Sequence, residues 1–356
     1  MTLAAGCKLG VFLNAMPLDL IRKFALQMDE GGFHSAWFPE ITFNDGLTPM
    51  AFVGTDTKDL LLGSAVVGAW SRSPLTMALT MATLNSALPG RVILGVGSQA
   101  RPYVNNWHGR TYQRPLLAMR EYVEIVQQIL RGETVTYEGE IFSIKDFALT
   151  FPPAQKVPVY MAAVGPKMLE LAGEIADGVI GAFWSVEYVR NVVIPRLSAG
   201  AERAGRTLEN FEISVGMPTL CTSDADAFKL HRGQVMQYAT ATKSSPAYER
   251  SVSEAGFEAE LAALKTNVAN KDYDAALAGI SDDMVNRLTL TGDPANVKQR
   301  INEYHDAGVT LVQANPTPPG AYFPFYEGHL DGAPFPEFDF PGFLGSIETY
   351  ISSMAS

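Results

Sequence analysis

The chain has 356 residues and carries 27 lysines and arginines against 38 aspartates and glutamates, a net charge of −11. This balance argues against nucleic acid and anionic membranes as partners, because both attract basic surfaces. Hydrophobic residues make up 47% and charged residues 18% of the sequence, so we expect a globular protein with a large core.

Short apolar runs rich in β-branched residues recur along the chain, with helical stretches between them. Most runs are continuously apolar, which is typical of parallel strands buried on both faces. The expected strands are Leu9–Leu13, Ala36–Phe38, Leu60–Val67, Val92–Val96, Val157–Ala163, Gly178–Phe183, Ile213–Met217 and Val309–Gln313. Repeated β-then-α order predicts a doubly wound sheet or a (β/α)8 barrel.

Two connections are longer than the others, and we interpret both as insertions in a single domain spanning 1–356. The first holds a helix, Pro115–Leu130, and then Thr134–Phe142, whose alternation around Glu138-Gly139 predicts a small hairpin. The second, 222–290, is polar and Ala-rich with helical spacing, so we expect a helical insertion without a strand.

The tail, 316–356, begins with a stretch dense in Pro, Gly, Phe and Tyr that excludes a regular helix as far as residue 341. Its aromatic residues would form an exposed apolar patch if left free, so we expect them to pack on the barrel or at a subunit contact. These residues are Tyr322, Phe323, Phe325, Tyr326, Phe335, Phe338 and Phe340.

A glycine-rich turn follows the fourth expected strand. Gly95-Val96-Gly97-Ser98-Gln99-Ala100 formally fits the G-x-G-x-x-G/A dinucleotide fingerprint. A Rossmann fold would place such a turn at its first strand, and this turn follows the fourth. Two other interpretations stay open: a turn without a ligand, and a turn at the carboxyl end of a barrel where a flat ring needs close backbone approach.

The segment from Ala162 to Gly173 runs from a strand of small residues through Gly165-Pro166 into an amphipathic helix. The start of such a helix binds anions through its free N–H groups and its dipole. Lys167 adds a positive charge, and Pro166 lies where no N–H is needed. The alternative is a tight turn that binds nothing.

Three further places carry candidate site residues. Glu40 ends the second expected strand, where it would orient a cofactor or substrate hydroxyl or lie as an exposed acid at the rim. The small residues of Leu62–Pro74 suit a bulge under a planar ligand and equally suit an ordinary loop. His108 follows the glycine turn, close to Arg110, and is either a site residue or a surface histidine. Glu40 and His108 are the catalytic candidates, and the catalytic residue itself stays unknown.

Cysteine and histidine usage excludes several kinds of site. Cys7 and Cys221 lie far apart with no CxxC pair, which excludes a disulfide framework and a zinc ribbon and favours the reducing cytoplasm. The five histidines show neither H-x3-H nor HExxH spacing, so no metal is expected. No apolar run approaches the ~18 residues of a transmembrane helix without a charge or breaker.

Taken together, these segments resemble the bacterial luciferase-like superfamily. The likeness is closest to its deazaflavin-dependent branch, which includes methylenetetrahydromethanopterin reductases and glucose-6-phosphate dehydrogenases that use coenzyme F420. It covers about residues 9 to 215 and the last strand. The stretches that carry it are Arg91–Gly97, the Arg114–Gly132 helix with Tyr137-Glu138-Gly139, Val157–Ala163 and Gly165–Gly178.

The resemblance implies a (β/α)8 barrel with the cofactor at its C-terminal mouth, and commonly a homodimer. It also implies a non-proline cis peptide at Ala65-Val66 against one face of the ring. Glu40, Gly97, Ser98 and Gln99 would border the ring and ribityl chain, and the next strand end would hold the phosphate. The implied cofactor-binding residues are Glu40, Ala65, Val66, Gly97, Ser98, Gln99, Ala163, Val164, Gly165, Pro166 and Lys167.

Two departures from that branch bear on the reaction. The sugar-phosphate dehydrogenases end the second strand in an Asp-His pair, whereas here Glu40 is followed by Ile41, and their acid beyond the glycine turn falls on Ala100. The resemblance therefore implies F420-dependent hydride transfer to a small unsaturated or imine-like substrate rather than sugar-phosphate oxidation. The alternatives are an FMN-dependent monooxygenase of the same fold and a non-catalytic flavin- or deazaflavin-binding protein.

Overall fold

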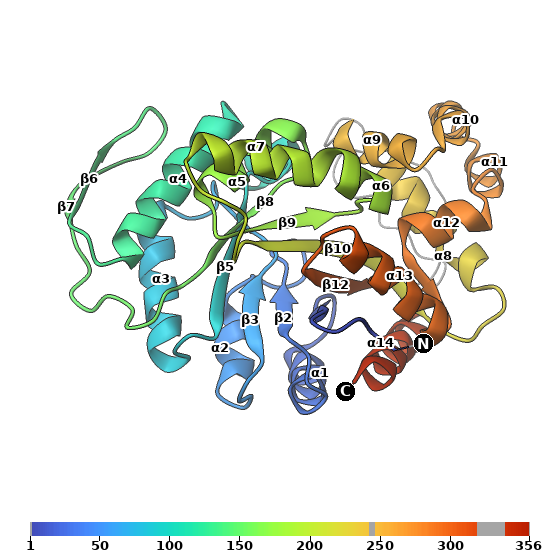
Figure 1. The fold of residues 1–356 in the computed structure, drawn as a ribbon, viewed down its shortest axis with the longest axis horizontal. Coiled ribbons are helices and arrows are strands. Elements are labelled where there is room, and N and C mark those ends of the chain that lie inside the picture. Colours follow the sequence, from blue (N-terminus) through green and yellow to red (C-terminus); the bar gives the residue numbers. More distant parts are fainter. Residues whose placement is uncertain (1, 242–245, 319–338, 356) are drawn as a thin grey trace. The chain divides into compact units, whose positions relative to one another are not determined.

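The computed structural model describes residues 2–241, 246–318 and 339–355. They belong to two compact units: unit 1 comprises 1–11, 181–195 and 213–356, and unit 2 comprises 12–180 and 196–212. Both units are built from parallel strands that alternate with helices (Figure 1). The fold class is the (β/α)8 barrel, as predicted from the sequence.

Unit 2 contains a run of parallel strands in the order β2-β3-β5-β8-β9, with the short strand β4 paired to β5. The strands are β2 (Ser35–Phe38), β3 (Leu61–Ser64), β4 (Val67–Gly68), β5 (Val92–Gly97), β8 (Val159–Ala162) and β9 (Gly178–Ala182). The helices are α1 (Leu18–Glu30), α2 (Thr48–Gly54), α3 (Pro74–Ala87), α4 (Pro115–Leu130), α5 (Pro166–Ile175) and most of α7 (Ile194–Arg203), with a π-helical turn, η1 (Tyr103–Trp107). Because all these strands are parallel, their carboxyl ends lie at one edge.

The strands of unit 2 pack around large rings that require glycine beside them. The ring of Trp37 on β2 covers Gly63 on β3, where an added Cβ would lie 2.3 Å from the indole. Trp37 also stacks on Tyr160 of β8, with ring centroids 6.0 Å apart. These contacts fill part of the space between β2, β3 and β8.

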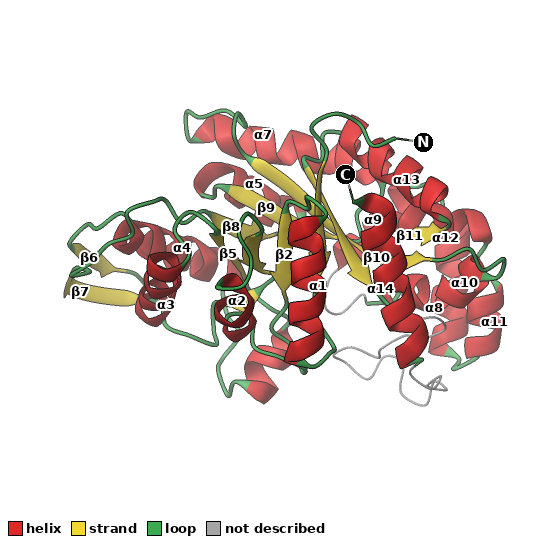
Figure 2. Cartoon of the chain, turned by 90° about the horizontal axis from the view of Figure 1, so that it is seen from below, coloured by secondary structure: helices red, strands yellow, loops and turns green. Residues whose placement is uncertain are grey.

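Unit 1 contains the strand order β11-β10-β12-β1, again parallel. Its strands are β1 (Lys8–Phe12), β10 (Glu212–Cys221), β11 (Leu290–Gly292) and β12 (Leu311–Pro316). Its helices are α6 (Val186–Tyr188), a π-helical turn η2 (Val189–Val193), α8 (Ala227–Ala239), α9 (Pro246–Glu254), α10 (Glu258–Ala269), α11 (Tyr273–Ala278), α12 (Asp282–Leu288), α13 (Pro294–Asp306) and α14 (Phe340–Met354). Helices α8 and α10 to α12 lie together at one side of this unit (Figure 2), around a shared apolar cluster.

Three expectations about local structure need correction. The expected strand Leu60–Val67 is interrupted between β3 and β4, at Ala65 and Val66. The region 222–290 is helical as expected, but its last residue begins a short strand, β11, that pairs with β10. The hairpin exists as β6 (Val135–Glu138) and β7 (Ser143–Phe147), but its turn lies at 139–142 rather than at Glu138-Gly139.

The expected packing of the aromatic tail falls largely outside the described residues, since Tyr322 to Phe338 lie there. Of these aromatic residues the structure describes Phe340, which begins α14. The helix therefore starts before the expected limit at residue 341, because its first turn tolerates Pro341. The buried face of this helix includes Phe343, Ile347 and Tyr350, so it packs on unit 1. None of the described helices combines the length and apolar character that crossing a membrane requires.

Candidate functional site

The carboxyl ends of β3, β4, β5 and β8 meet at a point where glycine is required. A Cβ added to Gly97, the last residue of β5, would lie 2.8 Å from Cγ2 of Val66 and 3.0 Å from Cβ of Ala162. The Ala65–Val66 peptide bond is cis, as the resemblance implied. The structure therefore brings Ala65, Val66 and Gly97, three of the predicted site residues, to one place.

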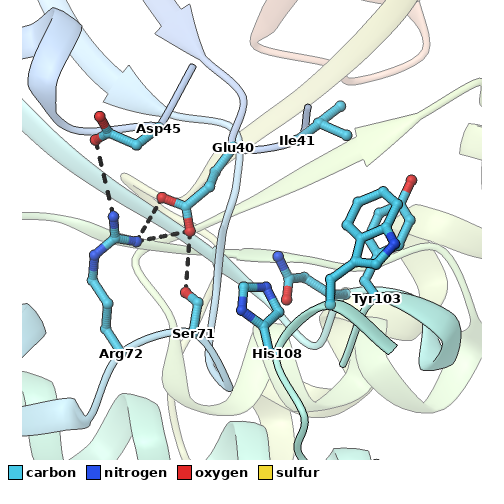
Figure 3. A pocket seen from close by; sticks show the side chains of 9 residues that line it. Glu40, Ile41, Asp45, Ser71, Arg72, Tyr103 and His108 are labelled. Atoms are coloured by element: carbon cyan, nitrogen blue, oxygen red, sulfur yellow. Dashed lines mark hydrogen bonds and ion pairs between the residues drawn. The ribbon is translucent and has the colours of Figure 1, made fainter. Parts of the chain in front are cut away.

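A cavity of about 410 Å³ opens beside these strand ends within unit 2 (Figure 3). Both catalytic candidates, Glu40 and His108, line this cavity, and so does Gln99, a further residue predicted to bind the cofactor. Its lining residues are Glu40, Ile41, Asp45, Ser71, Arg72, Gln99, Tyr103, Trp107 and His108. A pocket of this size is on the scale of small-molecule sites.

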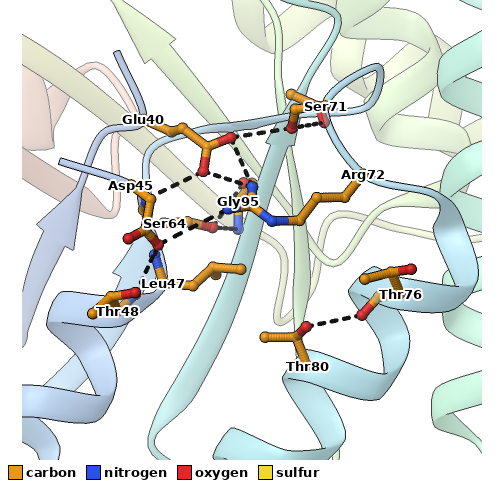
Figure 4. Close-up of polar contacts among 12 residues, drawn as sticks. Glu40, Asp45, Leu47, Thr48, Ser64, Ser71, Arg72, Thr76, Thr80 and Gly95 are labelled. Carbon is orange, nitrogen blue, oxygen red and sulfur yellow. Dashed lines mark hydrogen bonds and ion pairs between the residues drawn. The ribbon is translucent and has the colours of Figure 1, made fainter. Parts of the chain in front are cut away.

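Glu40 is fixed in this pocket by donors on both of its carboxylate oxygens. Nη1 of Arg72 donates to Oε1 at 2.7 Å and to Oε2 at 2.6 Å. The hydroxyl of Ser71 donates to Oε1 at 3.1 Å, and the backbone N–H of Gly46 donates to Oε2 at 3.3 Å. With the side chain of Glu40 only 13% exposed, these contacts supply the hydrogen bonds that a largely buried carboxylate needs (Figure 4).

A second acid, Asp45, lies on the other side of Arg72 (Figure 3). Nη2 of Arg72 is 3.9 Å from Oδ1 of Asp45, which also accepts the backbone N–H groups of Leu47 and Thr48 at 2.9 Å each. Burial acts to raise the pKa of Asp45, but the donors from Thr48 and Leu47 and the charge of Arg72 outweigh it, so its pKa lies below the usual value. Two carboxylates and one guanidinium thus make this end of the pocket negative.

Gln99 presents a buried acceptor beside the glycine turn. Its backbone is left-handed, with φ of +55°, and its amide packs on Gly68, where a Cβ would lie 2.2 Å from Oε1. Among the described residues that oxygen has no hydrogen-bond partner, although it is buried. A buried acceptor without a donor is costly, so this atom is suited to an N–H group of a bound ligand. Ser98 lies next to it, half-buried.

The opposite side of the pocket is aromatic. Tyr103 and Trp107, at the two ends of the π-helical turn η1, stack with their ring centroids 3.9 Å apart and their planes 15° apart. Tyr103 is buried, whereas Trp107 is 53% exposed. His108 follows them and is also exposed. An exposed indole at the rim of a pocket is suited to contact a flat ligand.

The predicted phosphate residues lie at the start of α5, after β8. Gly165 is the residue before the helix, has φ of −85°, and makes no side-chain cap. A Cβ added there would have no described atom within 4 Å, so neither the backbone nor the packing requires glycine at this position. Ala163 is buried, Val164 and Pro166 are half-buried, and Lys167 is exposed. None of these residues lines the cavity around Glu40.

Sequence reasoning missed several lining residues, and some had a readable signal. Asp45 stands three residues before Thr48-Pro49, the pattern of a helix start. Tyr103 and Trp107 are four residues apart, a spacing that places two rings on one helix face. Arg72 and Ser71 lay in a loop whose composition did not mark a site. Across the described ranges, no three His, Cys, Asp or Glu side chains gather as a metal-binding group.

Residues 4–311 match the family model described as luciferase-like monooxygenase, and the chain belongs to this family. It is therefore an enzyme of the oxidoreductase class, with its pocket at the carboxyl ends of the barrel strands.

Among curated proteins, the chain is 31% identical over 311 residues to the 5,10-methylenetetrahydromethanopterin reductase of Archaeoglobus fulgidus, covering 86% of this chain and 92% of that protein. Among solved structures, it is similar to the coenzyme F420-dependent tetrahydromethanopterin reductase of Methanopyrus kandleri, with a TM-score of 0.76, 24% identity and coverage of 87% and 93%. It is also similar to an F420-dependent secondary alcohol dehydrogenase, with a TM-score of 0.71, 20% identity and coverage of 88% and 94%. At these identities the two solved structures support the fold alone.

Proposed function

We propose that the chain is a coenzyme F420-dependent oxidoreductase that transfers a hydride between the deazaflavin and a small organic substrate. The relative in Archaeoglobus fulgidus is a reductase of 5,10-methylenetetrahydromethanopterin, and the similar reductase of Methanopyrus kandleri depends on coenzyme F420. The observation that carries the proposal for this chain is the start of α5, where Gly165 is open although the fold does not require glycine there.

The residues around the strand ends fit a deazaflavin. When bound, this cofactor supplies a carbon that accepts or donates a hydride. We assign Ala65, Val66 and Gly97 to its ring, because these residues come together at the strand ends beside the cavity. We assign Ser98 and Gln99 to the ring edge and ribityl chain, since Oε1 of Gln99 is a buried acceptor with no hydrogen-bond donor among the described residues.

The phosphate is assigned to the segment Ala163–Lys167. The first turn of α5 has no side-chain cap and carries the positive end of the helix dipole. Pro166 has no N–H, and the N–H of Met168 donates to the carbonyl oxygen of Gly165, so the donor that we assign to the phosphate in this turn is the N–H of Lys167. Gly165 keeps the approach to it free, and the ammonium group of Lys167 adds a charge. On a chain with a net charge of −11 this is a local positive site for an anionic cofactor.

The chain's own groups in the pocket hold the cofactor and orient the substrate. Both oxygens of Glu40 already accept hydrogen bonds, so we assign this carboxylate to holding a hydroxyl or N–H of the cofactor rather than to moving a proton. His108 is exposed at the rim and stays the candidate for proton transfer. The stacked Tyr103 and Trp107 close the other side and exclude water from a bound ring.

The test is an anaerobic assay in which reduced F420 and candidate acceptors, beginning with 5,10-methylenetetrahydromethanopterin, are mixed with the protein. We expect F420 to be oxidised in step with reduction of the acceptor. Oxygen consumption with reduced FMN, together with no reduction of any acceptor by reduced F420, would favour the monooxygenase alternative. Tight F420 binding without turnover of any acceptor would favour a non-catalytic binding protein.

We further propose that the protein is a cytoplasmic homodimer and that its two units form a single domain. Both cysteines are free thiols, which suits a reducing compartment. Helix α3 contains no charged residue, and Leu79 on its outer face is 43% exposed. An uncharged outer face of this kind suits contact with a second copy, and light scattering of the purified protein tests the dimer.

A further inference from the structure

The inserted hairpin β6–β7 is tied to helix α4 by one buried acid. This acid, Glu121 on α4, is only 3% exposed. Its Oε1 accepts the backbone N–H of Glu140, and its Oε2 accepts those of Ile141 and Phe142, all at 2.8 Å. One carboxylate thus satisfies three consecutive donors in the hairpin turn, which accounts for its burial.

The turn is shaped to fit this carboxylate closely. A Cβ added to Gly139 would lie 2.5 Å from Oε2 of Glu121 and 2.5 Å from the carbonyl oxygen of Phe142. The N–H of Gly139 donates to that same carbonyl at 3.1 Å and closes the turn. Glu121 therefore holds the turn against α4, and the backbone of Phe142 is held with it through its N–H.

Phe142 carries the contact onward to the loop after β4. Its ring lies 5.5 Å from the ring of Tyr122, edge to face, and 5.8 Å from that of Trp70. Nε1 of Trp70 has no hydrogen-bond partner among the described residues. Packing rather than a hydrogen bond therefore positions the indole, and the ring of Phe142 is one of its packing partners.

Trp70 directly precedes the two residues that hold Glu40. The hydroxyl of Ser71 donates to Glu40 at 3.1 Å, and Arg72 donates to both of its oxygens. A series of contacts thus leads from the hairpin turn to the pocket. The ring of Phe142 packs on Trp70, and Trp70 is followed in the chain by Ser71 and Arg72, which hold Glu40.

We propose that the hairpin is a latch, with Glu121 and Phe142 as positioning residues that fix Ser71 and Arg72 on Glu40 by supporting Trp70. The role of Glu40 in holding a ligand rests on the proposed function. The latch itself rests on contacts present in the protein without any ligand. It assigns a role in the site to an insertion that the barrel fold does not need.

The first test is amide hydrogen exchange of the protein alone, followed in the peptide that covers residues 66–75. Phe142→Ala should speed exchange there, because Trp70 and the N–H of Ser71, which donates to Gly68, lose their support. The matched control is Thr136→Ala, which removes a hydrogen bond to Asp146 at the open end of the same hairpin and should leave this peptide unchanged. Unchanged exchange in folded Phe142→Ala would overturn the latch, and Phe142→Leu serves if the alanine variant does not fold.

The second test is a double-mutant cycle on the dissociation constant for F420. Phe142→Ala should weaken binding about 5-fold in the natural background and less than about 2-fold in Glu40→Gln, since residues that act through one another are not additive. Equal weakening in both backgrounds would show that Phe142 does not act through Glu40. If the natural protein does not bind F420 at all, the proposed function fails, and the exchange experiment still decides the latch.

Discussion

A single nitrogen of Arg72, Nη1, lies 2.7 and 2.6 Å from the two carboxylate oxygens of Glu40. The side chains of Arg72 and Glu40 are 24% and 13% exposed, so solvent screens this pair only in part. The arginine also approaches Asp45, and the three groups together set the shape and charge of one end of the pocket.

Arg72→Lys tests this arrangement while keeping the charge. A lysine ammonium lacks the planar fork that reaches Glu40 and Asp45 together, so we expect about 1–2 kcal/mol less stability and weaker ligand binding. Urea denaturation and a ligand titration measure the two effects. The control is Arg22→Lys, whose exposed pair with Asp56 should matter by less than about 0.5 kcal/mol. Equal effects of the two substitutions would contradict the assigned role of Arg72.

Two glycines of the site should respond differently to alanine. Gly97→Ala places a Cβ against Val66 and Ala162 and should cost about 1–3 kcal/mol of stability, because both neighbours belong to the packed strand ends. Gly165→Ala meets open space at an ordinary φ, so its cost should stay within about 1 kcal/mol. Thermal or urea unfolding of both variants is the measurement. A larger loss at Gly165 than at Gly97 would reverse the interpretation of the two positions.

Lys167→Glu should weaken F420 binding by about 1–3 kcal/mol, and the loss should shrink at high salt because Lys167 is exposed. Lys145→Glu makes the same charge change on the exposed hairpin strand β7 and should have a much smaller effect. Titrations of both variants at low and high ionic strength make the comparison. A salt-independent loss, or an equal loss in the control, would show that Lys167 does not contact the anion.

The buried His231 of unit 1 predicts a defined pH dependence of stability. Its two ring nitrogens each lie 2.5 Å from a threonine hydroxyl, of Thr291 and Thr317, and burial lowers its pKa from 6.5 to about 3. The unfolded chain binds a proton below pH 6.5 that the folded chain does not. The free energy of unfolding should therefore fall as the pH drops from about 6.5 toward 3, by up to about 1.4 kcal/mol per pH unit from this group.

His231→Gln removes that titration and keeps a donor and an acceptor for the two threonines. The natural protein should lose stability relative to the variant on acidification. Its free energy of unfolding minus that of the variant should therefore be smaller at pH 5 than at pH 7. Urea denaturation at both values measures it. A difference that does not change with pH would mean that His231 titrates alike in the folded and unfolded chains.

The strands and the fold were predictable because buried parallel strands leave a local signal. Val92–Val96 and Gly178–Phe183 are continuously apolar between glycine-rich turns, and both are strands to within a residue or two. The helix Pro115–Leu130 was placed at its observed ends, since proline marks its start. The turn of the hairpin was misplaced because its conformation depends on Glu121, a residue 18 positions before Gly139.

The candidate site was predictable in part. Glu40 and His108 were expected near strand ends and line the pocket, Gly97 followed from the glycine-rich turn, and the cis bond at Ala65-Val66 followed from the family resemblance alone. The grouping of Arg72 with Glu40 and Asp45 did not follow, because it joins three chain segments through side chains that each look ordinary in sequence. Whether the predicted ring and phosphate residues bind a cofactor stays a prediction.

The central claim is that unit 2 binds a deazaflavin with its phosphate at the start of α5. Parallel titrations of the natural protein and Gly165→Leu with F420, and separately with FMN, test this claim most directly. We expect F420 to bind the natural protein more tightly than FMN does. Gly165→Leu should fold normally, because the space around this position is open, and should lose F420 binding. Equal F420 affinity in the two proteins would contradict the site, and tight FMN binding without F420 binding would contradict the cofactor.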